Sequence, residues 1–160
     1  MRRKDREVKE KEEIMDVFQK ADVCRLALSD GSVPYIVAMN FGLTADGRSL
    51  YFHCAHEGKK IDILKKNNLV CFQADIEHEL FLHSVSCGCS MKYKSIVGMG
   101  RITFVTGMAE KTMALQTIMA HYTKKSSHTF KAELVEKTMV LRLDIEEISC
   151  KALLRPGHQT

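Results

Sequence analysis

The sequence predicts a small antiparallel β-barrel with a few helices packed outside it. Three observations carry this prediction. Short stretches rich in β-branched and aromatic residues are separated by turn residues, which is typical of hairpins. Strands and helices follow the order β-β-β-α-β-β-α-β, which lacks the regular alternation of a doubly wound sheet. The chain has 160 residues, a length that forms one core rather than two.

Composition excludes several broad classes. Hydrophobic residues make up 45% of the chain and charged residues 28%, as in ordinary globular proteins and unlike disordered or collagen-like chains. No apolar run approaches the ~18 residues of a membrane span, and the charged start does not resemble a secretory signal. A net charge of +4, spread along the chain, is too weak to indicate nucleic acid. We therefore expect a cytoplasmic protein with neither a membrane nor a nucleic-acid partner.

The elements can be placed in order. Ile14, Val17, Phe18 and Ala21 repeat at helical spacing and predict a helix over about 10–20. The turn at 29–32 joins two strands into a hairpin. Gly98 and Gly100 lie inside a later strand, where a glycine marks a bulge or a close backbone approach. The predicted strands are 23–28, 34–41, 50–54, 69–74, 95–105 and 139–146, and the other predicted helices are 57–66, 108–122 and 131–136. The stretch 77–90 has no readable pattern.

Six cysteines are many for this length. In a reducing compartment they remain thiols, and the apolar neighbours of Cys24, Cys71 and Cys150 indicate small core residues. Cys87 and Cys89 form a Cys-Gly-Cys segment downstream of His78 and His83. Thiolate and imidazole ligands can bind zinc, although the spacing matches no zinc knuckle. A zinc site thus remains an alternative to a reduced loop or strand.

The most informative segment surrounds the predicted helix 57–66. Lys59 and Lys60 fall in its first turn, where the free N–H groups already carry partial positive charge and acidic residues are normally favoured. A bound anion would offset this conflict, and the N–H groups of Gly58 to Lys60 with the two ammonium groups could hold a phosphate. A solvated helix with a lysine face is the alternative, because Lys65 and Lys66 are also basic.

A second candidate segment is 90–100, where a polar, basic strand start carrying Ser95 leads into a strand with two glycines. Such a segment can present polar groups and bare backbone to a flat ligand. A strand start followed by a bulge explains the same residues without a ligand.

Eight motifs occur in the order found in one family. They are MRRKDR (1–6), CRLAL (24–28), PYIV (34–37), YFHCA (51–55), EGKK (57–60), NNLVCF (67–72), SMKYKSIVG (90–98) and IEEIS (145–149). Over residues 1–151 the chain resembles the Nim-type 5-nitroimidazole-resistance branch of the pyridoxamine 5′-phosphate oxidase-like flavoproteins. The resemblance implies an FMN-binding split-barrel domain over 1–151 and a C-terminal tail over 152–160.

The resemblance also implies a homodimer with flavins in clefts between the chains, and a flavin-dependent oxidoreductase. FMN is the expected cofactor, with FAD as the alternative. A reduced donor such as a nicotinamide would supply electrons, and an electron-poor acceptor such as a nitroimidazole would receive them. The implied catalytic residue is His53, which would supply protons together with water. The cofactor-binding residues implied are Lys59, Lys60, Gly58, His53, Cys54, Ser95 and Val37. For His56 we expect only an exposed loop position.

One departure limits what the family resemblance can mean. Pyridoxamine phosphate oxidases carry an Arg-x-His element near the C-terminus for their substrate, whereas the tail here contains Arg155 and His158 in the order Arg-Pro-Gly-His. Oxidation of vitamin B6 is therefore not expected. A flavin- or haem-binding redox sensor without turnover, built on the same barrel, is the alternative function.

Overall fold

The computed structural model describes residues 3–154. In chain order it contains η1 (Lys4–Arg6), β1 (Glu7–Val8), α1 (Lys11–Lys20), β2 (Cys24–Ser29), β3 (Pro34–Met39), β4 (Gly42–Leu43), β5 (Ser49–Cys54), α2 (Lys59–Lys66), β6 (Leu69–Phe81), η2 (Ser86–Gly88), β7 (Ser90–Val105), α3 (Met108–Thr123), α4 (Ala132–Glu136) and β8 (Met139–Leu153). None of the helices in this part of the chain is long and apolar enough to cross a membrane.

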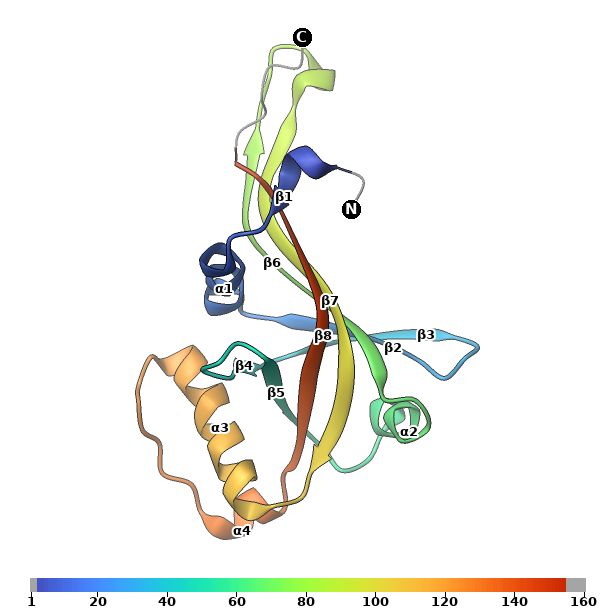
Figure 1. Cartoon of the computed structure of the whole chain (residues 1–160), viewed down its shortest axis with the longest axis vertical. Helices are drawn as coiled ribbons and strands as arrows, with labels where there is room; N and C mark the ends of the chain where they lie inside the picture. Colours follow the sequence, from blue (N-terminus) through green and yellow to red (C-terminus); the bar gives the residue numbers. More distant parts are fainter. Residues whose placement is uncertain (1–2, 155–160) are drawn as a thin grey trace.

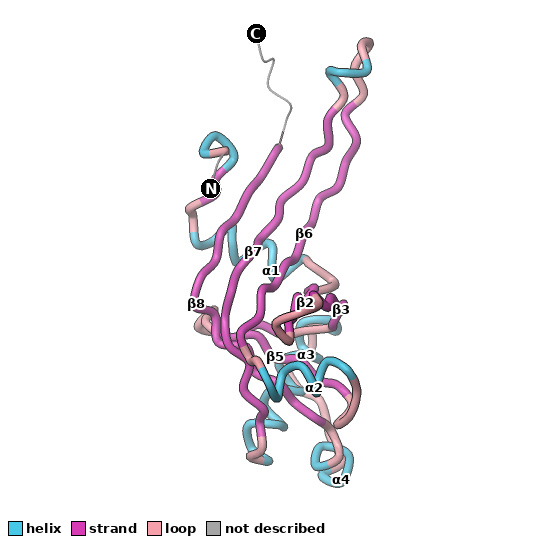
Figure 2. The backbone as a smooth tube through the Cα atoms, turned by 90° about the vertical axis from the view of Figure 1, so that its right-hand side faces the viewer, coloured by secondary structure: helices cyan, strands magenta, loops and turns pink. Residues whose placement is uncertain are grey.

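The strands form one antiparallel sheet in the order β3-β2-β6-β7-β8-β5-β4, with β1 paired to β8. Figure 1 shows the long strands β7 and β8 running the length of the molecule, with the β2–β3 hairpin crossing them at a steep angle. Helices α1 and α3 lie on one side of the long strands and α2 lies near the hairpin; Figure 2 gives the perpendicular view. The predicted mainly antiparallel fold is confirmed. Among the described strands, no pairing of β3 with β4 closes the sheet into a barrel.

Hydrophobic alternation explains which side of each strand is buried. Cys24, Leu26 and Leu28 of β2 are buried as predicted, while the residues between them are more exposed. They share one buried cluster with aromatic residues, in which the ring of Phe18 in α1 lies 6.2 Å, centroid to centroid, from both Phe41 and Phe72. The hydrophobic core therefore lies between α1 and the curved inner face of the sheet.

The predicted bulge in the glycine-containing strand is confirmed. The β7–β8 register shifts between Met99 and Gly100. A Cβ atom at Gly98 would overlap the Phe72 ring and the carbonyl oxygen of Glu147. Glycine is thus required at position 98 by the close approach of the core and of the neighbouring strand.

The predicted boundaries of four strands were wrong: 34–41, 69–74, 95–105 and 139–146. The strand expected over 34–41 ends at Met39, and a separate short strand, β4, follows it. The unreadable stretch 77–90 contains the end of β6, with Glu77 at φ 59° where the pairing shifts, and the turn η2. The last strand continues from 146 to Leu153, because its outer half pairs with the outer half of β7. The tail residues Arg155 and His158 lie outside the described residues.

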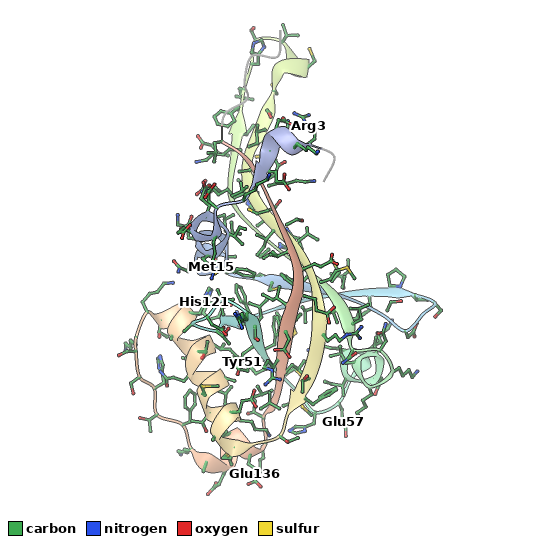
Figure 3. The ribbon with its side chains drawn as sticks, in the orientation of Figure 1. Arg3, Met15, Tyr51, Glu57, His121 and Glu136 are labelled. Atoms are coloured by element: carbon green, nitrogen blue, oxygen red, sulfur yellow. The ribbon has the colours of Figure 1, made fainter. Side chains whose placement is uncertain are left out.

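Helix α3 is fastened to the start of β2 by two side chains. The His121 ring nitrogen Nε2 lies 2.9 Å from the carbonyl oxygen of Ala21, and the Tyr122 hydroxyl donates to the carbonyl oxygen of Asp22 at 2.8 Å. Figure 3 shows His121 near the upper end of α3 and Tyr51 on the strand that faces the helix. Burial lowers the pKa of His121, so that the neutral ring is favoured in the folded state.

Candidate functional site

The N-terminus of α2 has the properties of an anion site. The helix begins at Lys59, after Gly58 at φ 122°, and no side chain caps its first turn. The first N–H groups of a helix have no intrahelical acceptor, so those of Lys59 and Lys60 are available to a ligand. A Cβ at Gly58 would meet nothing within 4 Å; glycine is favoured here by its positive φ rather than by crowding.

Both lysines are held against β3 rather than extended into solvent. The ammonium of Lys59 lies 5.0 Å from the centre of the Tyr35 ring, within cation–π distance. The Lys60 ammonium donates to the thioether sulfur of Met39 at 3.1 Å. Over residues 3–154, neither lysine has a carboxylate within ion-pair distance. Sulfur is a weak acceptor, which leaves the Lys60 charge largely uncompensated.

Val37 lies between the two side chains that contact the lysines. Tyr35, Val37 and Met39 alternate along β3 and share its less exposed face, since side chains two residues apart point the same way. All three pack against the main core. One face of β3 and the first turn of α2 therefore converge. The sequence reasoning identified Val37 and the lysines but missed Tyr35 and Met39, which the two-residue period of this strand could have revealed.

Lys59 and Lys60, together with Tyr35, Val37 and Met39 of β3, form a lysine cluster. Cys54, the last residue of β5, borders this cluster. Its thiol is half-buried. Burial raises the pKa of Cys54, and the Lys60 ammonium nearby acts in the opposite direction. A thiol that stays protonated next to an ammonium does not neutralise it, so Cys54 leaves Lys60 free to bind an anion.

The two histidines considered in the sequence are His53, in strand β5, and His56, in the loop that follows it. Successive side chains of a strand point to opposite faces, and Cys54 packs on the core that includes Phe52. His53 is exposed on the other face of β5. His56 is exposed, as expected, and its Nε2 lies 2.9 Å from the carbonyl oxygen of Lys137. Within one chain, the His53 imidazole therefore lies on the face of β5 opposite Cys54.

Ser95 lies on the opposite side of the sheet from the core. It pairs with Asp75 of β6 and with Lys151 of β8. Its neighbours on this outer face of β7 are Val97 and Met99, which are 44% and 40% exposed. No hydrogen bond in the described part of the chain joins Ser95 to the lysine cluster. Within one chain, Ser95 therefore belongs to a different surface.

The zinc alternative is not supported. Across the described range 3–154, no group of three His, Cys, Asp or Glu side chains is placed to hold a metal ion. His78 lies 2.6 Å from the Asp75 carboxylate, whereas His83, Cys87 and Cys89 lie at the tip of the β6–β7 hairpin. All six cysteines are free thiols, with Cys24 and Cys150 buried and Cys71 half-buried.

A large groove lies elsewhere than the lysine cluster. A groove of about 1380 Å³ lies between the N-terminal segment and the β6–β7 hairpin. The lysine cluster instead forms an open ledge at the edge of the sheet. Such a ledge supplies charge and hydrogen-bond donors for one end of a ligand without enclosing it.

Comparison with known proteins is consistent with this architecture. The sequence profile of the pyridoxamine 5′-phosphate oxidase family matches residues 10–152. A structure of a proposed 5-nitroimidazole antibiotic resistance protein from Bacteroides thetaiotaomicron is 33% identical, with a TM-score of 0.81, over 91% of this chain and 86% of that one. No protein with a curated description matches the sequence significantly.

Two more distant structures share the fold. A flavocytochrome from Azotobacter vinelandii is 18% identical with a TM-score of 0.77, over 94% of this chain and 70% of that one. A FAD-binding protein from Mesorhizobium loti is 21% identical with a TM-score of 0.65, over 91% of this chain and 96% of that one. The profile match spans nearly the whole sheet, and the motif order agrees with it. The chain belongs to the pyridoxamine 5′-phosphate oxidase family.

Proposed function

We propose that this protein binds a flavin nucleotide, FMN in the first place, through the ledge formed by α2 and β3. The observation that carries the proposal is the Lys60 ammonium, which lies 3.1 Å from the Met39 thioether and, within residues 3–154, has no carboxylate at ion-pair distance. An ammonium group at a helix N-terminus favours phosphate binding. The positive charge of the ammonium and the free N–H groups of the helix would both stabilise the phosphate.

The residues at the ledge fit the two halves of such a ligand. Lys59, Lys60 and the N–H groups that follow Gly58 would hold the phosphate. Val37 and Cys54 offer half-buried apolar surface beside it, suited to the sugar-alcohol chain and the edge of a flat ring. FAD also carries phosphate, as a pyrophosphate diester rather than the monoester of FMN, and is the alternative ligand of this ledge.

The proposal includes a homodimer, because one chain supplies only part of a flavin site. The outer sheet face around Ser95 carries exposed apolar side chains, among them Ile36 (67% exposed), Val97 and Met99. Burial of such a patch against a second copy would remove apolar surface from water. It would also let Ser95 of one chain approach the ledge of the other, which supports the predicted role of Ser95 as a cofactor contact.

Bound flavin would supply the redox chemistry, accepting electrons from a reduced donor and passing them to an electron-poor acceptor. We infer a nitroimidazole-like acceptor from the 33% identity to the Bacteroides protein. The chain's own residues would position the cofactor and exclude water from one side of it. We assign proton supply to water, because the His53 imidazole lies on the other face of β5.

A redox sensor without turnover is the second candidate. The observation that favours it is that the imidazole of His53, the predicted proton donor, lies on the face of β5 opposite Cys54. Such a protein would bind flavin and change its oxidation state without reducing an acceptor catalytically.

The absorption spectrum of the purified protein tests the cofactor, and kinetics test the activity. Flavin bands in the spectrum, with release of FMN on denaturation, are expected. Oxidation of a reduced nicotinamide that depends on a nitroimidazole would support the reductase, whereas flavin binding without turnover would support the sensor. A colourless protein that fails to bind added FMN would contradict both. Sedimentation should show a dimer, and a monomer that binds FMN tightly would contradict the shared site.

A further inference from the structure

The tip of the β6–β7 hairpin carries two thiols that the flavin site does not use. The hairpin extends beyond the rest of the sheet, at the top of Figure 1. Residues 80–91 contain no charged side chain. Cys87 is exposed there and Cys89 is half-buried, whereas Cys24 and Cys150 are buried in the core. Both tip thiols also line the groove of about 1380 Å³.

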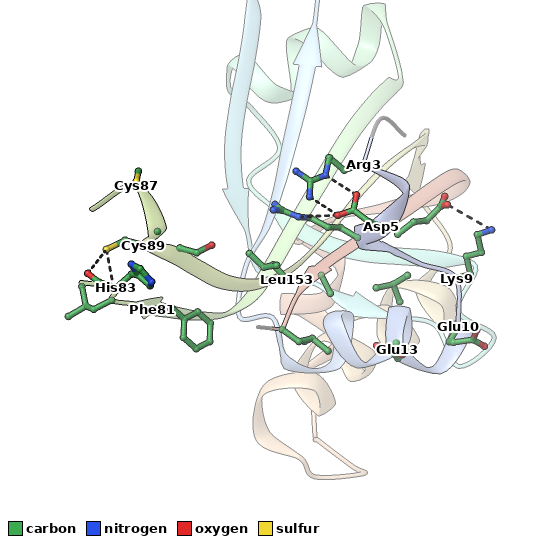
Figure 4. Close-up of a pocket in the computed structure, with 18 of the residues that line it drawn as sticks. Arg3, Asp5, Lys9, Glu10, Glu13, Phe81, His83, Cys87, Cys89 and Leu153 are labelled. Atoms are coloured by element: carbon green, nitrogen blue, oxygen red, sulfur yellow. Dashed lines mark hydrogen bonds and ion pairs between the residues drawn. The ribbon is translucent and has the colours of Figure 1, made fainter. Parts of the chain in front are cut away.

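Cys89 is held by the backbone of His83 on the opposite arm of the hairpin. The His83 N–H donates to the Cys89 sulfur at 3.3 Å, and the thiol donates to the His83 carbonyl oxygen at 3.8 Å. Figure 4 shows these contacts at the tip. These two contacts fix the position of the Cys89 sulfur against the opposite arm of the hairpin.

Gly88 brings the two cysteines into one tight turn. It lies in η2, where its N–H donates to the carbonyl oxygen of Val85 at 2.9 Å. A Cβ at Gly88 would lie 2.6 Å from two atoms of the His83 ring, Cγ and Nδ1. The Val85 N–H fixes that ring by donating to its Nδ1 at 3.1 Å. Only glycine therefore fits between the cysteines while the imidazole holds this position.

The turn places the cysteines within the reach of a disulfide. Residues two apart are separated by at most about 7 Å even in an extended chain, and a helical turn shortens this distance into the range that disulfides span. In Figure 4 the Cys87 side chain points away from Cys89. Because Cys87 is exposed, its side chain has room to rotate about the Cα–Cβ bond toward Cys89, and adjustment of the short turn η2 would complete the approach of the two sulfur atoms.

We propose that Cys87 and Cys89 form a thiol–disulfide exchange site for low-molecular-weight disulfides. The exposed Cys87, as its thiolate, attacks one sulfur of an external disulfide, forming a mixed disulfide and releasing one thiol. The Cys89 thiolate then attacks the Cys87 sulfur, forming the Cys87–Cys89 bond and releasing the second thiol. The two cysteines lose two electrons and two protons, and the external disulfide gains them as two thiols. This site is independent of the flavin ledge.

Intact-mass analysis of the full-length reduced protein, treated with oxidised glutathione, tests the site. The wild-type protein should lose the mass of two hydrogen atoms, and peptide mapping should place the new bond between Cys87 and Cys89. The C89S variant should instead keep one glutathionyl group on Cys87, because the resolving thiol is missing. C71S is the matched control, since Cys71 is half-buried on a strand, and it should behave like the wild type.

Gly88→Ala measures the contribution of the turn. Displacement of the His83 ring should slow ring closure severalfold, so that the mixed disulfide accumulates in this variant but not in the wild type. A stable glutathione adduct on the wild-type protein would overturn the proposal, and so would a disulfide mapped to other cysteines. Unchanged closure kinetics in the Gly88→Ala variant would contradict the role of the turn. Circular dichroism identifies any variant that fails to fold, and C89S then carries the test alone.

Discussion

The Nζ atom of Lys60 lies 3.1 Å from the Sδ atom of Met39, and no carboxylate in the described chain is close enough to form an ion pair with it. This contact joins the first turn of α2 to the edge strand β3. A thioether positions the ammonium while neutralising little of its charge. The contact between Lys60 and Met39 is therefore the one expected of a lysine that binds an anion rather than of one that stabilises the fold.

Replacing Lys60 by Ala should weaken the binding of FMN by about 10- to 150-fold, because a hydrogen bond to a charged group contributes about 1.5–3 kcal/mol. Riboflavin, which lacks the phosphate, should bind the variant and the wild type equally. Fluorescence titration of the cofactor-free protein measures both affinities. Lys65→Ala, in the exposed last turn of α2, is the matched control and should leave both unchanged. An equal loss of riboflavin binding would show that Lys60 supports the fold instead.

The Tyr35 ring should act as a positioning surface for Lys59. An exposed cation–π contact contributes about 0.5–1 kcal/mol, so Tyr35→Leu should weaken FMN binding by about two- to fivefold. Tyr35→Phe keeps the ring and should bind like the wild type. The same titration distinguishes the two variants, and equal affinities for Phe and Leu would argue against the cation–π contact.

Gly98→Ala should destabilise the protein by about 1–3 kcal/mol, the range for overpacking in a dense core. The added methyl group would overlap both the Phe72 ring and the Glu147 carbonyl oxygen. Gly107→Ala provides the control, because a Cβ there meets nothing within 4 Å. Urea denaturation should show a lower midpoint for the first variant only. Similar midpoints for both would mean that the bulge relaxes to accommodate the methyl group.

Stability should fall as the pH decreases through the range in which His121 gains a proton. Burial lowers the pKa of His121 in the folded state, so below about pH 6.5 the unfolded chain binds the proton more readily than the folded one. The loss of stability begins at about pH 6.5 and is complete below the folded-state pKa of His121. The free energy of unfolding at pH 7.5 and pH 5.5 measures it.

The control for this pH effect is His121→Phe, which keeps a ring beside Phe41 but cannot be protonated. The variant should lose stability at both pH values, because the contact with the Ala21 carbonyl oxygen is missing. Its stability should nevertheless change less between them than that of the wild type. An identical pH dependence in the two proteins would assign the effect to other groups.

The local elements of this protein could be predicted from the sequence because their signals are local. Alternation of Cys24, Leu26 and Leu28 predicted the buried face of β2, and helical spacing predicted α1. The conflict between the two lysines and the helix dipole indicated the anion site without any tertiary information. The motif order indicated the family, which the profile match and the 33% identical structure confirm.

Only the tertiary structure decided which residues meet. Tyr35 and Met39 contact lysines that follow them by more than twenty positions, and no local pattern encodes such a contact. The face of β5 on which His53 lies depends on strand register, which a shift of one residue would reverse. The β6–β7 hairpin and the outer half of β8 could not be predicted because their order comes from pairing between distant segments. Sequence periodicity thus determined the secondary structure and the charge of the site, while long-range strand pairing determined its shape.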